Sequence, residues 1–230
     1  AIDGVINDTV FINQLMDFLS QYSDVKMYIR FGGEMNIWTS KCTPEKFIQA
    51  FRKVADTVHS RLPGAAMVFS PYMVSEWNVN MDDFYPGDKY VDWVGLSLYL
   101  QKYFLGRNDW RDDQKYNEVV FLTGHNANAV TAIDEVIKLY GDRKPIMISE
   151  SGAGHHVISS FVNEDTTDWA VEKIKQYLAY LHMVYPQIKF MAYFDIFATM
   201  RNKGSGSSEP AKKNWPAISS YIGEEYDISD

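Results

Sequence analysis

Five apolar, strand-like runs alternate with amphipathic, helix-like segments along this chain, and this alternation limits the fold more than any other feature. The apolar runs are residues 25–31, 66–73, 90–100, 145–149 and 188–197. The helix-like segments are residues 8–22, 43–62, 127–140, 165–185 and 215–222. Nearly continuous apolar strands separated by amphipathic helices are typical of a parallel sheet covered by helices. The sequence therefore predicts an α/β fold.

Two of the helices have recognisable buried faces. The helix that begins at Thr43-Pro44 has a capping residue followed by proline at the first helical position. Helical spacing predicts that its buried side chains are Phe47, Phe51, Val54, Ala55 and Val58. In the first helix, the same criterion predicts that the buried side chains are Phe11, Leu15, Phe18 and Leu19.

The number of strands leaves two architectures open. A closed (β/α)8 barrel needs eight strands and typically about 250 residues. A complete doubly wound sheet can be built from five strands. The chain has 230 residues and contains no internal linker that separates domains, so residues 1–230 are interpreted as one domain or a piece of one. The choice between the barrel and the doubly wound sheet therefore depends on the candidate catalytic residues.

Composition excludes several classes of function. The net charge of −8 disfavours a dedicated nucleic-acid or anionic-membrane partner. No apolar run approaches the length of a membrane span, which is about 18 residues. The single cysteine, Cys42, excludes an intrachain disulfide and a cysteine-rich metal site. No glycine pattern for dinucleotides or phosphates occurs, so we expect no cofactor. The pair His155-His156 has no nearby Asp or Cys at ligand spacing, so we expect no metal ion.

Two glutamates follow strand-like runs. Glu34 comes just after the run that ends at Phe31, and Glu150 comes directly after the run 145–149. The carboxyl ends of strands carry the active site in barrels and open α/β sheets. Charged residues are rare there without a partner, because desolvating a charge is costly. Two facing carboxylates are what glycoside hydrolysis requires, although either glutamate alone could be an ordinary ion-pair partner.

Four segments resemble glycoside hydrolase family 26, a retaining β-mannanase family of clan A. Arg30-Phe31-Gly32-Gly33-Glu34-Met35-Asn36 with Trp38 is similar to its R-F-x-H-E-M-N-G segment. Residues 84–95 resemble its Y-Y-P-G-D-x-Y-V-D-x-I-G segment, and residues 144–152 resemble its nucleophile strand, K-P-x-x-x-x-E-x-G. Ile2-Asp3-Gly4 followed by Asp8 is similar to the entry to its third helix. Two positions depart from the pattern, since the family has His at Gly33 and Gly at Ile37.

The resemblance implies a (β/α)8 barrel of which this chain holds about strands 4–8 and their helices. An upstream segment or another chain would then supply the first three strands. The apolar edge runs 27–31 and 191–197 contain no proline, and neither is guarded by a lysine or a run of charges, so they are expected to be covered. Expressed alone, the chain is expected to be poorly soluble or oligomeric.

The resemblance also assigns roles to residues. Glu34 would be the general acid/base, Glu150 the nucleophile, and Tyr99 a hydrogen-bond partner of the nucleophile. Strand alternation puts Arg30 on the same face as Glu34, from where it can bring positive charge towards both glutamates. The carboxyl groups of a retaining pair are expected to lie about 5–5.5 Å apart.

The remaining candidates are substrate-binding residues, mostly aromatic side chains on loops: Asn36, Trp38, Trp77, Trp110, His155 and Trp215. The resulting hypothesis is an endo-acting, retaining hydrolase of β-mannan or a related β-linked polysaccharide. The alternative is a catalytically impaired, carbohydrate-binding barrel module, which the missing histidine would explain. Polymeric substrates lie outside cells, so the parent protein is expected to be secreted, with its signal before Ala1.

Overall fold

The computed structural model describes residues 2–73, 75, 79–100, 129–153, 156–158, 163–175 and 181–193. The helix expected at 215–222 and the end of the last expected strand, 194–197, lie outside these residues. Within the described residues, no helix is both long and apolar enough to cross a membrane.

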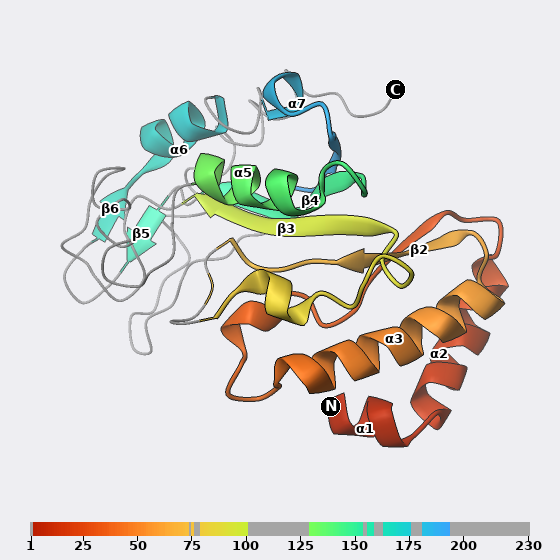
Figure 1. The fold of residues 1–230 in the computed structure, drawn as a ribbon. Coiled ribbons are helices and arrows are strands. Elements are labelled where there is room, and N and C mark those ends of the chain that lie inside the picture. Colours follow the sequence, from red (N-terminus) through yellow and green to blue (C-terminus); the bar gives the residue numbers. More distant parts are fainter. Residues whose placement is uncertain are drawn as a thin grey trace.

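A parallel sheet forms the centre of the described structure (Figure 1). Its five strands are β1 (Met27–Arg30), β2 (Ala65–Phe69), β3 (Trp93–Leu100), β4 (Ile146–Ala153) and β7 (Ile188–Met191). They lie in the order β1-β2-β3-β4-β7, and every neighbouring pair is parallel. The predicted α/β fold with a parallel sheet is thus confirmed. A small antiparallel pair was not predicted, and it consists of β5 (His156–Ile158) and β6 (Asn163–Asp165).

Helices cover the sheet on its outer side. The α-helices are α1 (Ile2–Asn7), α2 (Val10–Leu19), α3 (Pro44–Arg61), α5 (Ala129–Tyr140), α6 (Thr167–Lys173) and α7 (Leu181–Val184). The described residues also form the short 3-10 helices η1 (Ser20–Tyr22), η2 (Met35–Ile37) and η3 (Met81–Phe84). Helix α3 packs against β2 and against α1 and α2, whereas α5 packs along β3 (Figure 1).

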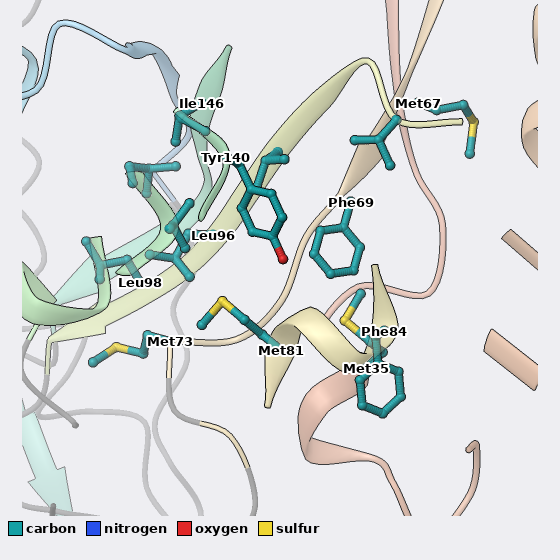
Figure 2. Close-up of a cluster of buried hydrophobic side chains, with 14 of the residues drawn as sticks. Met35, Met67, Phe69, Met73, Met81, Phe84, Leu96, Leu98, Tyr140 and Ile146 are labelled. Carbon is teal, nitrogen blue, oxygen red and sulfur yellow. The ribbon is translucent and has the colours of Figure 1, made fainter. Parts of the chain in front are cut away.

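Helix α3 forms as the sequence predicts. The Thr43 side chain caps it by accepting a hydrogen bond from the Lys46 N–H, and Pro44 is its first residue. All five side chains that were predicted to be buried are buried. The ring of Phe47 lies 5.7 to 6.4 Å from four other phenylalanine rings, which belong to Phe31, Phe51, Phe69 and Phe84. This aromatic group continues into the apolar cluster between the sheet and η3 (Figure 2).

Phe47→Ala is expected to lower the free energy of unfolding by about 3–5 kcal/mol, because it removes a buried ring from a close-packed group. Phe47→Leu keeps most of the volume and is expected to cost less than about 1.5 kcal/mol. Urea unfolding followed by circular dichroism measures both. Val10→Ala, at a side chain that is 57% exposed, is the control and is expected to change little. An equal decrease in the free energy of unfolding for Phe47→Ala and Phe47→Leu would contradict this explanation.

Helix α2 corrects one expectation from the sequence. Its buried residues are Ile12 and Met16, whereas Phe11 is 65% exposed and Phe18 is 54% exposed. The other two side chains predicted to be buried, Leu15 and Leu19, are half-buried and pack against the same core. Apolar residues thus follow two stripes of this helix, and the more exposed stripe runs from Phe11 through Phe18 to Tyr22 in η1, whose ring contacts Phe18.

The sheet is strongly curved. Strands β1 and β7 are four strand spacings apart, which in a flat sheet would separate their side chains by about 19 Å. The rings of Tyr28 in β1 and Phe190 in β7 are nevertheless only 5.6 Å apart. Tyr28 also makes an edge contact with Trp93 in β3, at 5.2 Å. These three rings therefore lie on the concave face of the sheet, where Tyr28 is 47% and Phe190 is 42% exposed.

Candidate active site

The guanidinium of Arg30 lies at the centre of the candidate site, at the carboxyl end of β1. Its Nε donates a hydrogen bond to Ser70 Oγ at 2.8 Å, and its Nη2 donates one to Ser97 Oγ at 2.7 Å. Its Nη1 donates to the Glu150 carboxylate and forms an ion pair with it. The cation therefore has hydrogen-bond partners in β3, in β4 and at the residue that follows β2, which hold it in position.

Glu150 lies inside β4 and not after its end, because β4 continues to Ala153. Leu96 pairs with Ile148 and Ser97 pairs with Glu150, so Ser149 is the extra residue of a β-bulge. A bulge re-aims the side chains that follow it. The Ser149 hydroxyl is 2.6 Å from Ser70 Oγ, and Glu150 Oε2 accepts a hydrogen bond from the Tyr99 hydroxyl at 2.7 Å. The bulge thus brings two consecutive side chains to the site.

Glu34 follows β1 in a tight turn. Gly32 has φ of 59°, and Glu34 itself adopts the left-handed conformation with φ of 62° and ψ of 30°. A non-glycine residue in this conformation costs about 1 kcal/mol or more, and such strain is common at functional sites. The Glu34 N–H donates to the Ser70 carbonyl at 2.8 Å, which holds the turn over the end of β2. Glu34 Oε1 then lies 3.9 Å from Arg30 Nη2.

The surroundings of Glu34 favour its protonated form. Burial raises the pKa of Glu34 above its usual range, and the neighbouring charge of Glu150 raises it further. A hydrogen bond with Ser97 and the charge of Arg30 oppose the rise, but they do not reverse it. The pKa of Tyr99 is also raised, by burial and by its bond to Glu150, so this hydroxyl remains a donor. Both glutamate side chains keep about a quarter of their surface exposed, which leaves them open to a ligand.

Asn36 does not face the open part of the site. It has no exposed surface, and its Nδ2 donates to the Tyr72 carbonyl and to Ser75 Oγ, both at 2.8 Å. Its Oδ1 accepts from the Tyr72 N–H at 2.8 Å. The amide is therefore occupied in holding the segment after β2, and its placement does not support the expectation that Asn36 binds substrate directly.

The other predicted substrate-binding residues have different outcomes. Trp38 is 47% exposed and follows η2, on the segment that carries Glu34, and Lys41 Nζ lies 4.8 Å from its ring centre. The remaining four lie outside the described residues, namely Trp77, Trp110, His155 and Trp215. In the part of the chain that the structure describes, no three His, Cys, Asp or Glu side chains gather as they would around a metal ion.

Sequence reasoning missed Tyr72 as a residue of this site. It lies after the end of β2 and forms an isolated bridge with Ser97 of β3. Burial, followed by the nearby charge of Glu34, raises the pKa of Tyr72 to about 12. No motif singles out Tyr72, because the apolar run 66–73 is interpreted as one continuous strand.

Comparisons with known proteins identify a family. The family model described as glycosyl hydrolase family 26 matches residues 24–186. No curated protein matches the chain.

Three solved structures share the fold. The family 26 β-mannanase BoMan26A from Bacteroides ovatus has a TM-score of 0.54 and 16% identity, over 94% of this chain and 56% of its own. The catalytic domain of the family 26 endo-β-1,4-mannanase from Bacillus sp. JAMB-750 has a TM-score of 0.54 and 16% identity, over 98% and 60%. GH26C from Muricauda sp. MAR_2010_75 has a TM-score of 0.52 and 14% identity, over 93% and 55%.

This chain therefore spans a little over half the length of these structures. At such identities the similarity concerns the fold. The family match covers more than half of the 230 residues, and it includes Arg30, Glu34, Tyr99 and Glu150. The chain belongs to glycoside hydrolase family 26.

Proposed function

We propose that this chain carries the catalytic pair of a retaining, endo-acting hydrolase of β-linked polysaccharides. Glu150 is the nucleophile and Glu34 is the general acid/base. The observation that supports these roles is the unequal surroundings of the two carboxylates. Two donors, from Tyr99 and Arg30, contact Glu150 directly. Arg30 Nη2 stays 3.9 Å from Glu34, which is beyond hydrogen-bond distance.

The different surroundings of the two glutamates match their different roles in double displacement. Hydrogen bonds and a cation favour an ionised Glu150, which attacks the anomeric carbon. Burial favours a protonated Glu34, which gives its proton to the leaving oxygen. Once ionised, Glu34 takes a proton from water, and the resulting hydroxide releases the sugar from Glu150. Two inversions at the same carbon retain the anomeric configuration.

The family and the exposed aromatic ring beside Glu34 both favour a β-linked polysaccharide as substrate. Two of the structures with the same fold are described as β-mannanases, so β-mannan and related β-glycans are the first substrates to test. The exposed ring of Trp38 is near the turn that carries Glu34, where it can stack on a sugar face. Because such polymers lie outside cells, we propose an extracellular site of action.

The proposed function is tested by incubating the chain with a panel of β-mannan, galactomannan, xylan and β-glucan and measuring the release of reducing ends. Proton NMR of the first products follows the anomeric configuration before mutarotation. We expect release from at least one β-glycan, with β-anomers formed first. Formation of α-anomers first would exclude the retaining mechanism. Binding without release from any polymer would favour the carbohydrate-binding module instead.

Tyr99→Phe is expected to lower kcat about 10- to 100-fold, because a hydrogen bond to a charged group contributes about 1.5–3 kcal/mol. Tyr85→Phe is the matched control. The Tyr85 hydroxyl also donates to a carboxylate at 2.7 Å, that of Asp88, which precedes β3 at its opposite end. This control is expected to affect stability while leaving kcat close to wild type. Equal losses of kcat in both variants would contradict the role of Tyr99.

We further propose that strands and helices outside this chain complete the sheet as a (β/α)8 barrel. The contact between Tyr28 and Phe190 supports this, because β1 and β7, with three strands between them, would lie on opposite sides of an eight-stranded barrel. Both rings are nearly half exposed at the centre of the concave face. The second apolar stripe of α2, from Phe11 to Tyr22, offers a further surface for the added part to cover.

The isolated chain is accordingly expected to form oligomers and to bind a hydrophobic dye such as ANS. The double variant Tyr28→Thr/Phe190→Thr is expected to reduce dye binding, whereas Val10→Thr is a control at an exposed site away from the concave face. Sedimentation velocity and dye fluorescence measure both properties. A monomeric chain that does not increase the fluorescence of the dye would contradict the proposal that further strands complete the barrel.

A further inference from the structure

Ser149 is the extra residue of the bulge in β4, and it directly precedes Glu150. Consecutive side chains of a regular strand point to opposite faces of the sheet, so only one of these two would reach the site. The bulge changes this. Ser149 Oγ lies 2.6 Å from Ser70 Oγ, and Ser70 accepts a hydrogen bond from Arg30 Nε at 2.8 Å. Glu150 accepts a hydrogen bond from Arg30 Nη1, so both residues connect β4 to the same guanidinium.

The hydrogen bonds of Ser70 leave a defined role for the Ser149 hydroxyl. A guanidinium has donors and no acceptor, so Arg30 Nε occupies one lone pair of Ser70 Oγ and cannot receive its hydrogen. That hydrogen and the second lone pair both remain, and Ser149 Oγ pairs with one of them. Ser70 has no exposed surface, so without Ser149 its hydroxyl would be a buried polar group that has lost a partner. Such a hydroxyl turns towards a new partner, and the lone pair aimed at Arg30 turns with it.

Gly95 of β3 supplies the space beside Ser149. A Cβ atom at position 95 would lie 2.9 Å from Ser149 Oγ, 3.0 Å from Ser149 Cβ and 3.1 Å from Ser70 Cβ. Carbon atoms in contact are usually about 3.5–4.0 Å apart, so a side chain here would push the two serines away. Glycine at 95 agrees with the family segment that residues 84–95 resemble, whereas the segment that residues 144–152 resemble leaves residue 149 open. The space belongs to the shared pattern, and the hydroxyl that uses it is a feature of this chain's own sequence.

We propose that Ser149 is a positioning residue of the active site, which acts through Ser70 to hold the Nε side of the Arg30 guanidinium. Glu150, the next residue, holds the Nη1 side. With both sides held, the guanidinium contacts Glu150 while its Nη2 stays 3.9 Å from Glu34. The proposal rests on the proposed hydrolase function for its kinetic consequences, but the hydrogen bonds themselves do not depend on that function.

Ser149→Ala tests the proposal, with Arg30→Met, the double variant and Ser151→Ala as companions. Ser151 is the matched control, because it lies in the same strand and its hydroxyl donates to the Ala192 carbonyl at 2.7 Å, not to the group around Arg30. We expect Ser149→Ala to lower kcat about 3- to 10-fold, as for the loss of one neutral hydrogen bond. In the Arg30→Met background the same change is expected to cost less than about twofold, because the group that Ser149 positions is already absent. Ser151→Ala is expected to leave kcat close to wild type.

A second readout separates positioning from a general structural role and does not require turnover. The Arg30 Nε–H signal in ¹⁵N NMR is identified by its absence in Arg30→Met, and its bond to Ser70 protects it from exchange with water. We expect faster exchange of this hydrogen in Ser149→Ala and unchanged exchange in Ser151→Ala. A loss of stability alone would not produce this difference between two serines of one strand.

The possible outcomes are distinguishable. An equal loss of kcat from Ser149→Ala with and without Arg30 would overturn the proposal, and so would unchanged exchange of the Nε–H in Ser149→Ala. Absence of turnover in the wild-type chain would count against the proposed hydrolase, and the NMR comparison alone would then decide whether Ser149 positions Arg30.

Discussion

Replacing Glu150 by glutamine is expected to lower kcat on a β-glycan by about 10⁴-fold or more, since loss of one member of a catalytic unit has an effect of this size. Glutamine keeps the shape of the side chain and can still accept a hydrogen bond from Tyr99. It has no negative charge with which to attack the anomeric carbon or to pair with Arg30. Glu135→Gln, at an exposed position of α5, is the matched control and is expected to retain full activity. The measurement is the initial rate of reducing-end release.

A second experiment distinguishes a nucleophile from a general base. Glu150→Ala leaves space beside the anomeric carbon, where added azide can attack from the face that Glu150 used. The expected product from an activated β-glycoside is the α-glycosyl azide, formed by a single inversion. Formation of a β-azide with Glu150→Ala would reject Glu150 as the nucleophile and point to a role in activating water.

Several features of the fold and site follow from local rules, which explains why the sequence predicts them. Helix α3 begins at Thr43-Pro44 and buries its apolar stripe, because capping and periodicity act within one helix. Parallel pairing follows from apolar strands separated by helices. Glu34 and Glu150 come near one another because the carboxyl ends of parallel strands share one edge of the sheet.

The contacts within the site depend on features that no periodic pattern encodes. Alternation predicts that Arg30 and Glu34 share a face, but the strand ends at Arg30 and the turn through Gly32 and Glu34 brings them together instead. The bulge at Ser149 places Glu150 inside β4 and still directs it to Tyr99. A one-residue irregularity of this kind arises from pairing with β3, which is a tertiary interaction.

The burial of Phe11 and Phe18 was predicted wrongly because the partner of a helix surface cannot be read from its own sequence. Helix α2 has two apolar stripes, and spacing alone does not say which one a neighbouring element covers. The contacts of Asn36 show the same dependence on tertiary structure. Its amide is bonded to Tyr72 and Ser75, and these partners depend on how the segment after β2 folds over η2.

Glu34→Ala is expected to change activity by an amount that depends on the leaving group. On polysaccharide, where the departing sugar oxygen needs a proton, kcat/KM is expected to fall about 10²- to 10⁴-fold. On a dinitrophenyl β-glycoside of the preferred sugar, the leaving group departs without help, so the first step continues. The second step then lacks its base, and a burst of dinitrophenol followed by slow turnover is expected. The same glycoside with Glu135→Ala should show wild-type behaviour.

The pH profile gives an independent check on this assignment. Glu34 must be protonated for the first step, so activity falls as pH rises through its pKa in the free enzyme. Because burial raises that pKa, the alkaline limb of kcat/KM on polysaccharide should lie above the range of an ordinary glutamate. In Glu34→Ala this limb is expected to disappear, and azide is expected to restore turnover of the dinitrophenyl glycoside as the β-azide. An alkaline limb that persists unchanged in Glu34→Ala would show that another group supplies the proton. Tyr72 is not that group, because its pKa of about 12 is too high for such a limb.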